Sequence, residues 1–116
     1  MRLRQPTDFL ILEALASKGR NVATNLEYHT GKSRKNINTR LPVLEDYGLV
    51  EKIGPAERSG LYEITPTGKA ALIHREQYDE VDDFEALLEG PQANAPAGGE
   101  VQAAFARGDA EPDDRD

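Results

Sequence analysis

The hydrophobic pattern changes from a helical period to a strand period near Gly48, and this change limits the folds open to the chain. Before Gly48, apolar residues recur every three to four positions, which is the spacing of amphipathic helices. After it, the short runs 49–53 and 61–64 are rich in β-branched and aromatic residues, which favour strands. We therefore expect a mainly α fold with a small β-hairpin.

Three helices are expected before the hairpin. The first begins with Thr7 as its N-cap and ends before Gly19, and the second covers residues 25–29 with Thr24 as its cap. The third begins after the cap Ser33 and continues to about residue 46. A short turn around Gly31 joins the second helix to the third, which is the arrangement of a helix-turn-helix. The expected buried rows are Phe9, Leu12 and Ala16 in the first helix, and Ile37, Leu41 and Leu44 in the third.

Pro42 falls inside the third predicted helix. A proline there lacks the N–H group that would bond to the carbonyl of Asn38, and its ring clashes with that carbonyl. We expect a kink at this position because Leu41 and Leu44 must both face the core. The alternative is a break into two helices at Leu41.

The segment after the hairpin returns to a helical pattern. Thr65 and Pro66 fit the N-cap and first position of a helix, and apolar residues recur from there toward Gly90. A fresh start at Asp79 or Asp82 would divide this stretch into two helices. The pattern alone leaves both interpretations open.

Two motifs within these elements resemble a known family. Tyr47-Gly48-Leu49-Val50-Glu51 follows the leucines of the third helix, and Thr65-Pro66-Thr67-Gly68 follows the hairpin. The stretch from about residue 5 to residue 78 resembles winged helix-turn-helix transcriptional regulators of halophilic archaea, both phage-repressor-like and MarR-like. This resemblance implies a three-helix core, a wing, a C-terminal helix and a role as a DNA-binding repressor. The motifs are specific for the fold and much less so for the DNA target.

The outward side of the third helix carries groups that suit the major groove of DNA. At about 100° per residue, Lys35 and Thr39 lie opposite Ile37, with Asn36 and Asn38 on the flanks. Lysine can donate to guanine, and asparagine can pair with adenine. Lys32, Ser33 and Arg34 begin the helix, where N–H groups also favour phosphate. The alternative is that this basic face is simply solvated.

Two arginines outside this face are further candidates for DNA contact. Arg40 lies beside the buried row of the third helix, where it can contact phosphate or brace Glu45. Arg58 lies in the hairpin loop, which in winged proteins commonly reaches the minor groove or phosphates. Its alternative is a solvated loop.

Charge divides the chain into a basic part and an acidic part. Residues 1–78 carry 12 Lys and Arg against 9 Asp and Glu, whereas residues 79–116 carry 2 against 12. The proline- and glycine-containing segment after Gly90 has too few large apolar residues to fold, so we expect a disordered acidic tail. A short partner-binding helix over residues 100–107 is the alternative. The expected divisions are a winged domain over 5–78, a helical extension over 79–90 and the tail over 91–116.

Composition excludes several classes of function. The chain has no cysteine, so a disulfide framework, a thiolate zinc site and an iron–sulfur site are excluded. His29 and His74 have no ligand-type neighbours in the sequence, and the acids between Asp79 and Asp83 lack EF-hand spacing. We expect no catalysis, cofactor or metal, and no small-molecule ligand can be inferred. No apolar run is long enough for a membrane span, and we expect a cytoplasmic protein without a signal peptide.

The expected partners are double-stranded DNA and a second copy of the chain. Winged regulators bind pseudo-palindromes as dimers, and Ala70, Gln77 and Phe84 recur every seven residues as a candidate seam. The first half of that helix can equally pack on its own domain. The alternative function is a winged-helix module that binds a protein and no DNA. RNA binding is disfavoured because we expect no exposed aromatic pair for base stacking.

Overall fold

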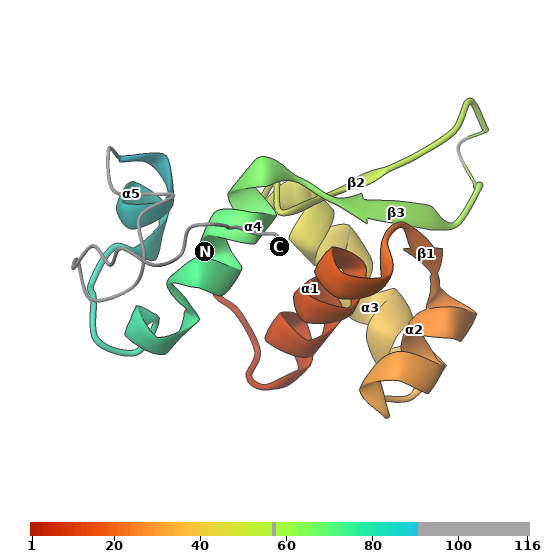
Figure 1. Ribbon diagram of the computed structural model, residues 1–116, viewed down its shortest axis with the longest axis horizontal. Coiled ribbons are helices and arrows are strands. Elements are labelled where there is room, and N and C mark those ends of the chain that lie inside the picture. Colours follow the sequence, from red (N-terminus) through yellow and green to blue (C-terminus); the bar gives the residue numbers. More distant parts are fainter. Residues whose placement is uncertain (57, 91–116) are drawn as a thin grey trace. The chain divides into compact units, whose positions relative to one another are not determined.

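The change of period near Gly48 coincides with a change from helix to strand in the computed structural model, which describes residues 1–56 and 58–90. Internal contacts divide the chain into two units, residues 1–72 and residues 73–116. The predicted disordered tail over 91–116, with its alternative helix over 100–107, lies outside the described residues. The first unit contains α1 (Thr7–Lys18), β1 (Asn21–Val22), α2 (Ala23–Thr30), α3 (Arg34–Asp46), β2 (Val50–Lys52) and β3 (Leu61–Ile64), followed by α4 (Pro66–Ile73), which ends at the first residue of the second unit (Figure 1).

Helix α1 begins at Thr7, one residue earlier than expected. Pro6 occupies the N-cap position, and Thr7 is the first helical residue and is buried, so the expectation of a Thr7 cap is wrong. Phe9 and Leu12 are buried as expected, but Ala16 is exposed because the buried face turns toward Ile11 and Leu15. Gly19 ends the helix and donates its N–H to the carbonyl of Leu15 at 3.0 Å. Helix α2 likewise begins after Val22 rather than after Thr24.

The expected hairpin forms and gains a third strand. Strands β2 and β3 pair antiparallel, with Val50 opposite Ile64 and Lys52 opposite Tyr62. The short segment Asn21–Val22 pairs with the other edge of β3, which gives the strand order β1-β3-β2. The loop of the hairpin extends beyond the helices of the first unit (Figure 1). The described chain is therefore mainly helical with a small antiparallel sheet, as the hydrophobic pattern predicts.

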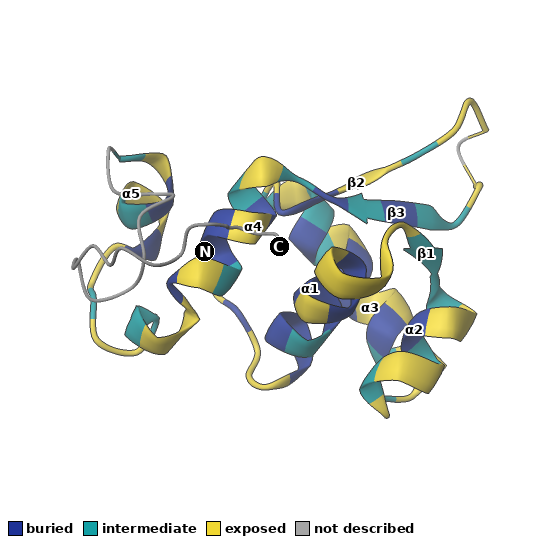
Figure 2. Ribbon diagram, viewed as in Figure 1, coloured by how far each residue is buried: buried dark blue, intermediate teal, exposed yellow. Residues whose placement is uncertain are grey.

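Aliphatic side chains from the helices and the hairpin form the core of the first unit. Helix α1 contacts α2, α3 and β3, and α3 also contacts β2, so the core lies where these elements meet. Figure 2 shows that buried and exposed residues alternate around the helices, as expected for amphipathic elements. The largest fully buried apolar side chains are Ile11, Leu12, Leu15, Leu26, Ile37, Leu41, Leu44, Leu49 and Val50.

Helix α3 continues through Pro42 without a break. It extends from Arg34 to Asp46, so the alternative of two helices separated at Leu41 is wrong. Asn38, whose carbonyl loses its helical partner at Pro42, is exposed, and water can therefore bond to that carbonyl. Pro42 is exposed as well, so its ring displaces no core side chain. The expected kink stays a prediction.

Helix α4 begins where Thr65 is predicted to cap it. The Thr65 hydroxyl accepts the N–H of Gly68 at 3.0 Å and donates to the carbonyl of Gly48 at 2.6 Å. Gly68 packs directly against the backbone of Leu49, and a Cβ at this position would collide with the Leu49 carbonyl oxygen. The glycine of the Thr-Pro-x-Gly motif is therefore required by a close approach between α4 and the chain entering β2.

The apolar pattern after α4 is interrupted, so the expected C-terminal helix is at least two elements. Within the described part of the second unit, residues 75–77 form a 3-10 turn (η1, Arg75–Gln77) and α5 covers Phe84–Glu89. Asp83 caps α5 by accepting the N–H of Ala86 at 3.1 Å, in place of the expected Asp79 or Asp82. Tyr78 and Phe84 pack edge to face with their ring centres 5.1 Å apart.

The proposed heptad seam does not exist as one helical surface. Ala70 belongs to α4, Gln77 to η1 and Phe84 to α5. Ala70 and Phe84 are also buried within the chain. The expectation that these three residues form a heptad seam on one helix is wrong, because the helix that would align them ends at Ile73.

Candidate nucleic-acid interface

A three-residue connection between α2 and α3 sets the orientation of α3. Gly31 ends α2 in the left-handed conformation, at φ 76°, which a residue with a side chain adopts only with strain. The Thr30 hydroxyl accepts the N–H of Lys32 at 3.1 Å. Ser33 then caps α3, as predicted, by accepting the N–H of Asn36 at 3.1 Å. Local sequence chemistry thus fixes both the end of α2 and the start of α3.

The core side of α3 determines which residues face outward. Ile37, Leu41 and Leu44 are fully buried, as expected from their spacing. On the other side, Lys35, Asn38 and Thr39 are exposed, and Asn36 is half-buried. We refer to Lys35, Asn36, Asn38 and Thr39 as the polar face of α3. The structure brings these four predicted site residues together on one accessible side of a single helix.

The polar face retains most of its hydrogen-bonding capacity. No hydrogen bond or ion pair with another described residue holds the ammonium group of Lys35 or the side-chain amide of Asn38. The Thr39 hydroxyl donates to the carbonyl of Lys35 at 2.9 Å, so toward a ligand it serves as an acceptor. The face therefore offers ammonium and amide donors together with amide and hydroxyl acceptors.

The first turn of α3 is cationic, which runs against the helix dipole. Lys32, Arg34 and Lys35 lie at the positive end of the helix, and this first turn contains no acidic residue. No Asp or Glu occurs anywhere between residues 28 and 44. Within the described chain, the only side-chain hydrogen bond of these three cations joins Arg34 to the Thr24 hydroxyl at 3.3 Å. A bound anion at this turn would relieve the unfavourable charge.

Arg40 is not part of this surface. Its side chain is 8% exposed, and its guanidinium bonds to Asp8 through Nε to Oδ1 at 2.9 Å and through Nη2 to Oδ2 at 2.8 Å. These hydrogen bonds to Asp8 raise the pKa of Arg40 above its ordinary value, although burial acts in the opposite direction. The phosphate contact and the brace to Glu45 are therefore both replaced by a buried ion pair. The helical position of Arg40 could not reveal this partner, because Asp8 is 32 residues away in the sequence.

Arg58 lies apart from the polar face, on the loop of the hairpin. Its side chain is exposed, and the neighbouring Ser59 hydroxyl donates to the carbonyl of Ile53 at 2.6 Å. Strand β2 contacts α3, so the hairpin is fixed to the helix at its base while the loop extends away (Figure 1). The structure thus places Arg58 on a different element from the other predicted site residues.

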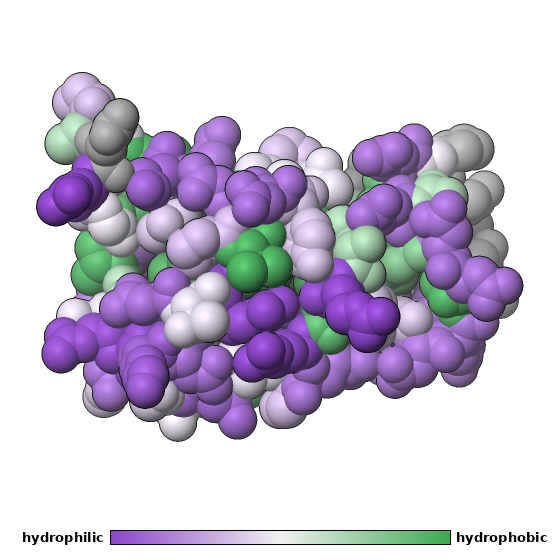
Figure 3. Space-filling view, turned by 180° about the vertical axis from the view of Figure 1, so that it is seen from behind, coloured by the Kyte–Doolittle hydropathy of each residue, from purple (hydrophilic) through white to green (hydrophobic). Residues whose placement is uncertain are grey.

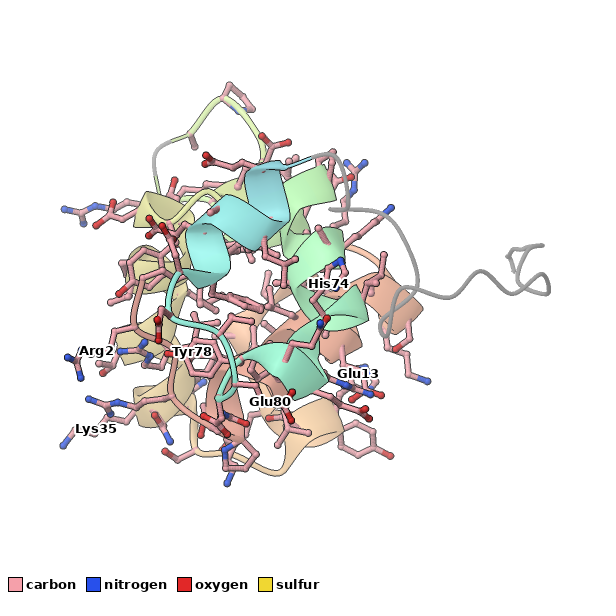
Figure 4. The ribbon with its side chains drawn as sticks, turned by 90° about the vertical axis from the view of Figure 1, so that its left-hand side faces the viewer. Arg2, Glu13, Lys35, His74, Tyr78 and Glu80 are labelled. Atoms are coloured by element: carbon pink, nitrogen blue, oxygen red, sulfur yellow. The ribbon has the colours of Figure 1, made fainter. Side chains whose placement is uncertain are left out.

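One exposed arginine that the helical pattern did not single out, Arg2, lies near α3. The backbone of Arg2 bonds to Tyr47, the residue that ends α3, and to Arg40. In Figure 4 the side chains of Arg2 and Lys35 extend toward the same side of the molecule, whereas Glu13 lies on the other side. The signal in the sequence is Arg2-Leu3-Arg4, which is basic but too short to carry a period.

The side toward which Lys35 and Arg2 extend is the one seen in Figure 3. Hydrophilic side chains cover most of it, and the hydrophobic areas on it are small. On α2, by contrast, Tyr28 is 86% exposed, and its ring lies edge to face with that of His29 at 5.4 Å. The expectation that no exposed aromatic pair is present is therefore wrong. These two rings are neighbours on one helix and form a single pair.

Further observations concern metals, membranes and hollows. In the described ranges, no three His, Asp or Glu side chains are grouped closely enough to hold a metal ion. No described helix has the length and apolar character of a membrane span. A surface hollow between α1 and α2 is lined by Leu10, Glu13, Ala14, Ser17, Lys18 and His29.

Comparison of the chain with protein-family models, with curated proteins and with solved structures found no match.

Proposed function

We propose that this chain is a winged helix-turn-helix protein that binds double-stranded DNA sequence-specifically and regulates transcription as a repressor. The observation that carries the proposal is the polar face of α3. It lies on the second of two helices joined by a short turn, opposite a fully buried apolar row. The sequence segment that contains it, residues 28–44, has no Asp or Glu. An exposed helix with these groups fits the width and the hydrogen-bonding pattern of the major groove.

The polar face supplies the base contacts in this proposal. Lys35 donates to the O6 and N7 atoms of guanine, and Asn36 and Asn38 pair with the N6 and N7 atoms of adenine. Thr39 accepts a hydrogen bond from an exocyclic amine, because its own proton is used within the helix.

The start of α3 and the hairpin loop supply the backbone contacts. Lys32 and Arg34 neutralise phosphates, and Ser33 donates its hydroxyl proton to phosphate while it caps the helix. Arg58 contacts phosphate or the minor groove from the loop between β2 and β3. Arg40 takes no part, because its guanidinium is already bound to Asp8.

We further propose that the protein acts as a homodimer in the cytoplasm. Repressors of this kind read two half-sites about 10 base pairs apart, and a two-fold arrangement of two α3 helices would match that spacing.

Selection from random duplexes tests the proposal. The purified full chain is incubated with a random-sequence duplex pool at about 1 M salt, where nonspecific binding through phosphates is suppressed. We expect enrichment of one sequence with two inverted half-sites. A variant carrying Lys35→Ala and Asn36→Ala should lose at least about 10-fold in affinity for the enriched site, since each base contact contributes about 1–3 kcal/mol.

The matched control is Lys69→Ala, which removes a cation from an exposed position of α4. It should bind the enriched site like the unmodified chain. If the pool shows no enrichment and the chain binds no duplex even at low salt, the proposal is wrong.

The exposed Tyr28 supports a second candidate, a module that binds another protein through α2. Tyr28 is 86% exposed, and tyrosine is common at protein interfaces. A Tyr28→Ser variant separates the two candidates, because it should leave DNA affinity unchanged and abolish a protein contact. Preferential binding of single-stranded RNA over duplex DNA would instead favour stacking on Tyr28 and His29.

A further inference from the structure

Hydrogen bonds hold Arg2 against the end of α3 and Arg4 against the start of α1. The N–H of Arg2 donates to the Tyr47 hydroxyl at 3.0 Å, and the carbonyl of Arg2 accepts from that hydroxyl at 3.3 Å and from Arg40 Nη2 at 3.4 Å. The N–H of Arg4 donates to Asp8 Oδ2 at 2.7 Å, and the Arg4 carbonyl accepts the N–H of Asp8 at 2.8 Å. Such short segments are normally mobile unless they are tied down in this way.

The side chains of this segment divide into one anchor and two outward cations. Leu3 is buried, whereas Arg2 and Arg4 on either side of it are exposed. No hydrogen bond or ion pair with another described residue holds either guanidinium group. The buried pair of Asp8 and Arg40 thus fixes the backbone of residues 2–4 and leaves their charges available.

The position of this segment complements the polar face of α3. Lys35 lies in the first turn of α3, and Tyr47 follows its last residue, so at 1.5 Å per residue they are about 18 Å apart along the helix. The major groove is about 12 Å wide. A helix whose first turns contact bases therefore brings its far end near the phosphates that border the groove. Arg2 is attached at that end, and its side chain extends toward the same side as Lys35 (Figure 4).

We propose that residues 2–4 are a second DNA-binding element, in which Arg2 and Arg4 bind backbone phosphates flanking the bases read by α3. This inference rests on the proposed function. Arg2 and Arg4 contact DNA directly, and Tyr47 and Arg40 act as positioning residues. The element adds affinity without sequence preference, because phosphate contacts carry no sequence information.

The salt dependence of binding tests the two arginines directly. Affinity for a labelled 24-base-pair duplex of mixed sequence is measured by fluorescence anisotropy at several KCl concentrations, with any purification tag at the C-terminal end. Each neutralised phosphate contributes about −0.9 to the slope of log affinity against log salt. The variant with Arg2→Ala and Arg4→Ala should therefore lower the slope by about 2 and weaken binding about 10-fold to 30-fold near 0.15 M salt.

The matched control is Lys18→Ala. Lys18 lines the hollow shared with Glu13, and Glu13 lies on the other side from Arg2 and Lys35 (Figure 4). Loss of this cation should leave the salt slope unchanged. An equal effect of Lys18→Ala would show that net charge alone matters, and it would overturn the inference.

Tyr47→Phe tests positioning without a change of charge. It removes the hydroxyl that holds the Arg2 backbone and leaves both guanidinium groups in place. Binding should weaken about 3-fold in the unmodified chain and not at all in the chain that already lacks Arg2 and Arg4. An equal loss in both backgrounds would show that Tyr47 acts independently of residues 2–4, which would contradict the proposed coupling.

The outcomes separate this inference from the proposed function. If the unmodified chain binds the duplex but the double arginine variant keeps its salt slope, the second element is wrong and the role of α3 stands. If the unmodified chain binds no duplex at any salt concentration, both proposals fail. Circular dichroism of each variant shows whether the fold is retained.

Discussion

Replacing Arg40 with methionine should destabilise the first unit severely, because it leaves a buried carboxylate without its cation. Asp8 is fully buried, and Arg40 is the residue that contacts both of its oxygens. Removal of one partner of a buried ion pair typically costs about 3–5 kcal/mol. Asp8 Oδ2 would still accept the N–H of Arg4, so we expect a value near the lower limit, about 3 kcal/mol.

A loss of this size is a large share of the stability of a small domain. Total stabilities are about 5–15 kcal/mol, and 1 kcal/mol shifts the melting temperature of a domain this small by about 4–8 °C. Arg40→Met should therefore lower the melting temperature by more than about 10 °C. Urea unfolding followed by circular dichroism measures the change in the free energy of unfolding directly.

Two further variants isolate the cause. Arg34→Met removes an exposed arginine from the same helix and should change the free energy of unfolding by less than about 0.5 kcal/mol. The double variant Asp8→Leu and Arg40→Met replaces the pair by apolar side chains and should recover most of the loss. If Arg40→Met costs less than about 1 kcal/mol, or if the double variant is as unstable as the single one, the argument from the buried carboxylate is wrong.

Three other substitutions test individual features of the fold by the same urea measurement. Gly68→Ala should destabilise by about 2 kcal/mol or more, because its Cβ would collide with the Leu49 carbonyl. Pro42→Ala should stabilise by about 1–2 kcal/mol, since it restores an N–H for the carbonyl of Asn38 within a continuous helix. Ser33→Ala should destabilise by about 1 kcal/mol through loss of the α3 cap.

Each of these expectations has a clear contrary result. A neutral or stabilising Gly68→Ala would mean that α4 and Leu49 do not approach so closely. A destabilising Pro42→Ala would mean that the bend expected at the proline is itself needed for packing. A neutral Ser33→Ala would mean that water replaces the cap at no cost, and Ser33→Asp, which should retain the cap, serves as its control.

Features that depend on nearby residues were predicted well from the sequence. The apolar spacing of Ile37, Leu41 and Leu44 predicted the buried side of α3 and hence its polar face. The Ser33 and Thr65 caps form as expected, because a cap needs only a hydroxyl and the N–H groups of the next turn. The hairpin over residues 50–64 also followed from a local change of period.

Features that depend on distant residues were predicted poorly. The surface role expected of Arg40 failed because its partner Asp8 lies on α1. The seam of Ala70, Gln77 and Phe84 failed because a spacing of seven residues aligns side chains only if one helix continues through them, and α4 ends at Ile73. The fixed backbone of Arg2 and Arg4 could not be predicted, because a segment of three residues has no period and its hydrogen-bond partners lie elsewhere in the sequence.

The sequence alone determined which side chains α3 exposes, because periodicity and capping act within a few residues along the chain. Only the tertiary structure decided which cations remain available on the surface, because burial and ion pairing depend on residues brought together from distant positions. Asp8 binds Arg40 in a buried ion pair. Arg40 and Tyr47 in turn hydrogen-bond to the backbone of Arg2 and hold it beside α3. The order of charges along the chain does not show which cation is buried and which is exposed, because Coulomb and desolvation energies depend on separation and solvent access in space.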